Sequence, residues 1–257
     1  MAGAFSHGTE TCEMNQKGKK SKTLTTCVYC GSEEPCTEEH VLPRCLFPET
    51  GMPLKSEFVI VPACKSCNKN KGCDDSYVRD LLVADVACEN NPTVMALLPA
   101  VVRSAEKNWS HFARVASSES RIEAVYSPSD LYSGHHLGVP IDWKRLERYF
   151  SLVVRGLCWH RFKERLPDNY VFEVHRLHEA DAAVISHDLI NHGGQDPFVI
   201  GSDVFSAHFT IHPDNRFITC WLVHFYQSIS FSITTGPTSY FDQCEAPTSK
   251  SKHFGFW

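Results

Sequence analysis

The sequence predicts an α+β protein in which a short cysteine-rich module, stabilised by zinc, precedes a helical connector and a strand-rich C-terminal domain. Two Cys-x2-Cys pairs and five prolines lie within residues 27–67. Apolar residues recur at helical spacing before residue 167 and gather in strand-like runs after residue 170. The chain of 257 residues is long enough to bury a sizeable core around this arrangement.

Three segments are expected along the chain. Residues 1–22 are polar and contain four lysines, which is typical of a flexible leader. Residues 23–90 form the cysteine-rich module, and residues 91–257 form the helical connector and the α+β C-terminal domain. The role of that last segment is not evident from its composition.

The prolines exclude long helices before Pro62. The first half of the chain is expected to contain a strand at 58–61, a helix at 74–90, a helix at 100–117, a strand at 122–126 and a loop at 134–140.

A helix beginning after Asp142 is the clearest element of the sequence, because an aspartate is a favourable N-cap. Its apolar positions recur at steps of three to five: Leu146, Phe150, Val153, Leu157 and Phe162. Strands are expected at 171–174, 198–200, 204–211 and 217–233, with a turn at 212–215 and an irregular tail after Gly236.

Charge and hydropathy restrict the function classes. The net charge is −5, so any surface that binds nucleic acid must be local. The N-terminus has no apolar signal segment, and no uninterrupted apolar run reaches the roughly 18 residues of a membrane span. We therefore expect a cytoplasmic protein without a membrane partner, whose twelve cysteines serve as metal ligands or free thiols rather than disulfides.

Two cysteine pairs carry the strongest local signal. Cys27-Val-Tyr-Cys30-Gly and Cys64-Lys-Ser-Cys67-Asn each allow two thiolates to point to one corner of a tetrahedron. Four thiolates close the coordination shell, so the spacing predicts a structural Zn²⁺ rather than a catalytic one. In so small a module, metal binding supplies much of the folding free energy.

The residues between and after the two pairs decide what the module does. Thr37-Glu-Glu39-His40-Val-Leu-Pro43-Arg44 places a carboxylate beside a histidine, and Asn68-Lys69-Asn-Lys71 follows the second pair. Together with the cysteines, this pattern resembles the HNH endonuclease family over about 46 residues. The resemblance implies a treble-clef-like ββα-metal fold in which a β-hairpin and a helix hold one divalent ion.

The resemblance also implies roles for individual residues. Glu39 and Asn68 would be ligands of a catalytic Mg²⁺ or Mn²⁺, with Glu38 as a displaced alternative to Glu39, and His40 would be the general base. The chemistry agrees, because histidine titrates near neutrality and oxygen ligands suit a hard ion. In a strand, Glu39 and His40 would point to opposite faces. Arg44, Lys69 and Lys71 are the candidate nucleic-acid contacts.

Two positions depart from the family pattern. Many members carry an asparagine about five residues before the second cysteine pair, where it helps to orient the histidine, but this chain has Val59 there. Another group or a backbone carbonyl must therefore orient His40. Glu39 also stands where aspartate or histidine is commoner, and its extra methylene changes the reach to a metal.

The sequence thus predicts a metal-dependent endonuclease that hydrolyses phosphodiester bonds, with DNA favoured because the family mostly cuts DNA. A noncatalytic zinc module that binds nucleic acid or protein is one alternative. Another is a nuclease effector whose C-terminal domain senses a partner or a small signal, as in bacterial antiviral defence. The C-terminal domain is also expected to offer a surface for a protein partner or for a second copy of the chain. A stripe formed by Lys144, Arg148 and Arg155 is expected to be either a solvated helix face or a support for the DNA backbone.

Overall fold

The computed structural model describes residues 26–107, 121–126, 132–138, 141–191 and 193–242. These residues form helices, hairpins and one larger antiparallel sheet, so the predicted α+β class is confirmed. The expected leader at 1–22 and the end of the expected helix at 100–117 lie outside the described residues.

The cysteine-rich part folds as a hairpin followed directly by a helix. Strand β1 (Cys36–His40) pairs antiparallel with β2 (Ile60–Cys64), and α1 (Lys65–Ala84) begins at the next residue. Helix α1 begins nine residues before the predicted position because the Cys64 sulfur accepts a hydrogen bond from the Cys67 N–H and so caps the first turn. The connection between the strands contains only short 3₁₀ turns, η1 (Arg44–Leu46), η2 (Glu49–Gly51) and η3 (Lys55–Glu57).

The helix expected at 100–117 begins earlier than predicted, at Pro92. A short turn η4 (Val86–Cys88) precedes α2 (Pro92–Lys107), whose first N–H groups bond to the side chain of Asn91. Asn91 thus caps the helix, and Pro92 occupies the first helical position, where a missing N–H costs nothing. Strand β3 (Arg121–Tyr126) is confirmed, but the loop expected at 134–140 is wrong at its start, since Gly134 lies in β4 (Tyr132–Gly138).

Helix α4 (Trp143–Phe162) is confirmed. Asp142 accepts a hydrogen bond from the Arg145 N–H at 3.1 Å, and the helix ends at Phe162, before Lys163, whose φ of 56° is left-handed. Leu146, Phe150, Val153 and Leu157 are buried, as their spacing predicts, and Phe162 is partly buried.

The C-terminal strands form one five-stranded antiparallel sheet in the order β5-β9-β8-β7-β6. Its members are β5 (Tyr170–Leu177), β6 (Gln195–Ile200), β7 (Phe205–His212), β8 (Asn215–Phe225) and β9 (Ile229–Pro237). The expected continuous strand at 217–233 is wrong, because Tyr226 and Gln227 adopt positive φ values of 52° and 59° and reverse the chain. Helices α5 (Glu179–Asn191) and α6 (Thr238–Phe241) were not predicted.

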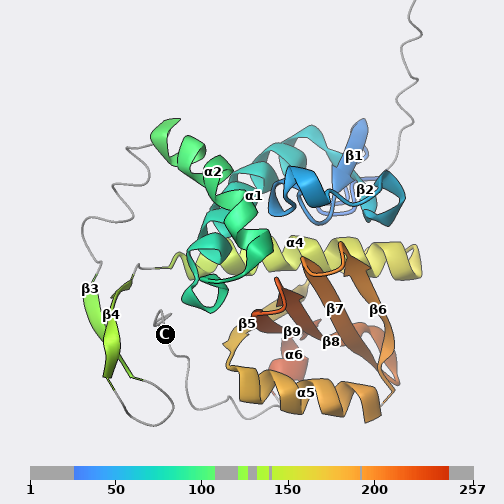
Figure 1. Cartoon of the computed structure of the whole chain (residues 1–257). Coiled ribbons are helices and arrows are strands. Elements are labelled where there is room, and N and C mark those ends of the chain that lie inside the picture. Colours follow the sequence, from blue (N-terminus) through green and yellow to red (C-terminus); the bar gives the residue numbers. More distant parts are fainter. Residues whose placement is uncertain (1–25, 108–120, 127–131, 139–140, 192, 243–257) are drawn as a thin grey trace, which may run out of the picture.

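Helix α4 lies between the N-terminal elements and the sheet, and α5 covers the opposite face of the sheet (Figure 1). One hydrophobic core joins these layers, from Val41 and Leu46 through Phe150 to Trp221. A polar contact also crosses it, because the Tyr226 hydroxyl donates to the Leu46 carbonyl at 3.0 Å. The boundary expected after residue 90 is therefore not a break in packing.

In the part of the chain that the structure describes, no helix has both the length and the apolar character that a membrane span requires.

Candidate metal centre and the surrounding hairpin

The four predicted cysteines come together. The sulfur atoms of Cys27, Cys30, Cys64 and Cys67 all lie within 4.8 Å of one another. Zinc–thiolate bonds of about 2.3 Å in a tetrahedron place sulfurs about 3.8 Å apart, and Cys30 Sγ lies 3.8 Å from Cys64 Sγ. The donor set and its spacing fit one structural zinc ion, with no position left open for a substrate.

Local backbone structure explains this convergence. The first pair lies in a tight turn in which Gly31 donates to the Cys27 carbonyl at 2.9 Å and has a φ of +73°. Glycine adopts that conformation without strain. In the second pair, Cys64 ends β2 and Cys67 lies in the first turn of α1.

The Cys27 thiol is partly prepared for metal binding. Burial raises its pKa, but backbone hydrogen bonds around the turn outweigh burial and lower the pKa to about 7. A thiolate is the form that binds zinc, so this turn favours the ligating state.

Glu39 and His40 end β1 and lie on opposite faces of it, as alternation along a strand requires. The Glu39 side chain faces α1 and is buried, whereas His40 is half-buried and its ring packs edge-on against Phe58 at 5.1 Å between centroids. Asn68, in the first turn of α1, donates to Thr37 Oγ1 at 3.2 Å.

Lys71 is placed differently from the expectation. Its side chain is 0% exposed, so it is not available to a phosphate. The ammonium donates to the His40 carbonyl at 3.0 Å and to the Asp75 carboxylate at 2.9 Å, and it lies 3.1 Å from Glu39 Oε1. The cation beside Glu39 in this structure is therefore a lysine.

The other predicted contact residues remain at the surface. Arg44 and Lys69 are exposed. Glu38, the alternative ligand, is also exposed, and its Oε2 lies 3.6 Å from Lys55 Nζ. Among the described residues, the four cysteines form the only group of three or more His, Cys, Asp or Glu side chains that gathers around one point.

The environment of His40 favours the neutral form of its imidazole. Burial lowers its pKa below the ordinary value, with further lowering by Arg44 and Lys71, although Glu39 opposes the change. The apolar side chain of Val59 cannot orient the His40 ring. The Val59 carbonyl accepts a hydrogen bond from the Val41 N–H at 2.9 Å. Phe58 takes the adjacent position against the ring instead.

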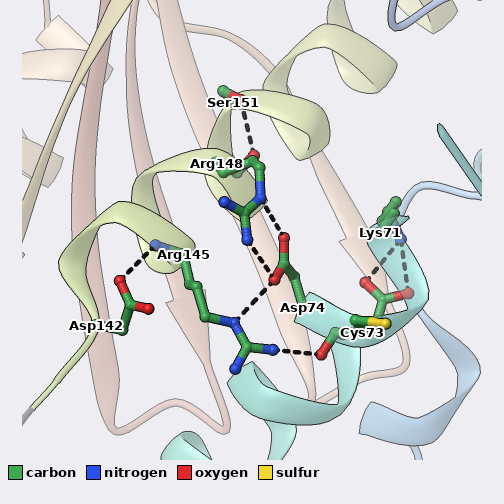
Figure 2. A network of polar contacts seen from close by, with 8 residues as sticks. Lys71, Cys73, Asp74, Asp142, Arg145, Arg148 and Ser151 are labelled. Atoms are coloured by element: carbon green, nitrogen blue, oxygen red, sulfur yellow. Dashed lines mark hydrogen bonds and ion pairs between the residues drawn. The ribbon is translucent and has the colours of Figure 1, made fainter. Parts of the chain in front are cut away.

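The two arginines of the predicted cationic stripe on α4 bind groups of the same chain. Arg148 and Arg145 both bind Asp74 of α1, and Arg145 also donates to the Cys73 carbonyl (Figure 2). Arg155 is buried and donates to the Leu166 carbonyl at 2.9 Å. Two of the three cations of the stripe, expected to be solvated or to support the DNA backbone, thus join parts of the same chain.

Asp75 and its bond to Lys71 were missed by the sequence reasoning. The signal was present, because residues four apart share one face of a helix and Lys71 precedes Asp75 by four. What the spacing could not show is that this face is buried against β1.

Comparison of the chain with protein-family models, with curated proteins and with solved structures found no match.

Proposed function

We propose that the protein hydrolyses phosphodiester bonds in nucleic acid, most favourably DNA, with His40 as the general base. The observation that carries this proposal is the state of His40. His40 is the last residue of strand β1, and its imidazole ring is half-buried. Neither ring nitrogen forms a hydrogen bond with another described residue. A neutral imidazole with free nitrogens can take a proton from an attacking water.

The surroundings of His40 support a polyanionic substrate. Arg44 and Lys69 are both exposed, Arg44 just after β1 and Lys69 in the second turn of α1. The N-terminus of α1 adds oriented backbone N–H groups, which favour phosphate. The cysteine centre would hold zinc and stabilise the hairpin and helix that carry these groups.

The resemblance to HNH endonucleases also implies a divalent ion between Glu39 and Asn68. The two side chains offer oxygen atoms of the right kind. In this structure, however, Glu39 pairs with the Lys71 ammonium, so its carboxylate as placed does not fit an ion between it and Asn68. We assign no catalytic step to such an ion.

That same pairing favours a second candidate, a zinc-stabilised module that binds nucleic acid or protein without cutting it. A buried Glu39–Lys71 pair is a way of joining β1 to α1 in a purely structural module. The two candidates differ in whether His40 performs chemistry.

Cleavage of supercoiled plasmid separates them. Zinc-loaded full-length protein is incubated with plasmid in Mg²⁺, in Mn²⁺ and without added ion, alongside His40→Ala and the remote surface variant His187→Ala. The proposal expects wild type and His187→Ala to cut, and His40→Ala to lose at least 100-fold in rate while retaining its zinc. Equal cleavage by His40→Ala removes the assigned base, and binding without cleavage by any protein supports the noncatalytic module.

A further inference from the structure

We infer that Lys71, and not a divalent ion, is the cation that neutralises Glu39, and that this pair acts as a positioning device for His40. The second half of this inference rests on the proposed function. The first half concerns only what occupies the position beside Glu39.

The ammonium of Lys71 has a full set of partners. It donates to the His40 carbonyl at 3.0 Å and to the two Asp75 carboxylate oxygens at 2.9 and 3.1 Å, and it forms an ion pair with Glu39, 3.1 Å from Oε1. Full satisfaction of this kind is what a buried charge requires. No donor of Lys71 is left over for a substrate.

Burial holds Lys71 in this position. Its side chain is 0% exposed and that of Glu39 is 10% exposed, so screening by water is weak. A divalent ion bound to Glu39 would lie within a few ångströms of the ammonium, and like charges repel strongly in such surroundings. Moving Lys71 away would leave a buried cation without partners.

The same contacts connect the pair to His40. Lys71 binds the backbone carbonyl of His40, and Glu39 is the preceding residue of β1. The end of β1 is therefore fixed to α1 from one side, while Phe58 contacts the imidazole ring from the other. Glu39 therefore fixes the position of the His40 ring, and Glu39 itself does not contact a substrate.

Paramagnetic broadening tests the occupant of the position beside Glu39. Substoichiometric Mn²⁺ is added to the isotopically labelled, zinc-loaded full chain, and amide signals are followed by NMR. We expect no selective broadening at Glu39 and Asn68, either because Mn²⁺ does not bind or because it binds elsewhere. Selective broadening of both signals in the wild-type protein would overturn the inference. This measurement needs no variant and no cleavage activity.

A Glu39→Gln variant tests positioning, with the exposed Glu49→Gln variant as its matched control. We expect the cleavage rate of Glu39→Gln to fall at least tenfold at every Mg²⁺ concentration, with the Mg²⁺ midpoint within twofold of wild type. Loss of a metal ligand would instead raise the midpoint at least tenfold and be relieved by more Mg²⁺. That result, or an unchanged rate, overturns the positioning role.

A spectroscopic measurement keeps the two proposals distinguishable. The imidazole carbon and proton signals of His40 are expected to shift in Glu39→Gln and to stay unchanged in Glu49→Gln. If no protein cuts nucleic acid but these shifts and the Mn²⁺ result hold, the proposed function fails while the placement by Lys71 and Glu39 stands. Unchanged His40 signals in Glu39→Gln contradict the positioning device.

Discussion

Arg148 donates two parallel hydrogen bonds to the Asp74 carboxylate, with Nε 2.7 Å from Oδ2 and Nη2 2.8 Å from Oδ1. The pair joins α4 to α1, and the Asp74 side chain is only 2% exposed. Arg145 binds the same carboxylate from the preceding turn of α4. Asp74 thus connects α1, the helix that follows the cysteine-rich hairpin, to α4, the helix that supports the sheet.

Replacing this aspartate should be costly. Asp74→Asn removes the charge that two arginines share, and we expect the free energy of unfolding to fall by about 3 kcal/mol. Urea denaturation followed by circular dichroism measures it. The control is Glu147→Gln on the exposed face of α4, which should change stability by less than about 0.5 kcal/mol. Equal effects of the two substitutions would contradict a structural role for Asp74.

Zinc should be bound by the four cysteines and by no other thiols of the described chain. Cys30→Ser is expected to abolish the bound zinc and lower the melting temperature by about 10 °C, because the metal supplies folding free energy to the hairpin. Cys73→Ser changes an exposed thiol outside the cluster and should retain one zinc per chain. Zinc content is measured by colorimetric release. Full zinc binding by Cys30→Ser would show that the cluster is not the zinc site.

Two glycines of the helices should respond in opposite directions to alanine. A Cβ at Gly156 of α4 would stand 2.4 Å from Val41 Cγ2, so Gly156→Ala should destabilise the protein by about 2 kcal/mol. A Cβ at Gly72 of α1 meets nothing within 4 Å, so Gly72→Ala should stabilise it by about 0.5–1 kcal/mol. Thermal denaturation of both variants measures the signs. A neutral Gly156→Ala would mean that α4 does not approach the β1 segment this closely.

Asp75 should make stability depend on pH. Burial raises its pKa to about 6, despite the opposing effect of Lys71. The unfolded carboxyl titrates near about 3.9, so between these values the folded state binds the extra proton and stability rises as the pH falls. Relative to Asp75→Asn, wild type should gain about 2 kcal/mol between pH 7 and pH 4. Parallel pH profiles of urea unfolding for the two proteins would contradict it.

The pH dependence of cleavage should report His40. Because burial lowers the pKa of His40, the acidic limb of the rate profile is expected to have its midpoint below 6.5. His40 is ionised below that midpoint and cannot accept a proton. Single-turnover plasmid cleavage from pH 5 to pH 8 measures the limb. A midpoint well above 6.5 would point to a different base.

Local sequence signals predicted part of the fold and the cysteine centre. Asp142 caps α4 through its own side chain, and the two cysteine pairs specify their turns through short spacings. Signals of this kind depend on neighbours in sequence, so they can be read without knowing the fold. Helix α5 has no such local signal. Its apolar residues do not mark one buried face, because Val184 and Ile190 are exposed while only Ala182 and Leu189 are buried.

The surroundings of His40 could not be read in the same way. Lys71 looked like a phosphate contact because lysine is usually exposed, and only the packing of α1 on β1 places it against Glu39 and the His40 carbonyl. The same holds for Arg148, whose partner Asp74 is 74 residues away. Contacts between distant segments decide whether a cation meets solvent or a carboxylate.

The position of α4 between the hairpin unit and the sheet limits how this protein can be divided. Leu146, Phe150 and Val153 belong to the same core as Val41 and Trp221. A fragment cut after residue 90 would expose the surface that α4 covers and would lose the partner of Leu46, the Tyr226 hydroxyl. The segment formed by β1, β2 and α1 therefore cannot be moved alone into another protein. Any transfer of this segment must include α4.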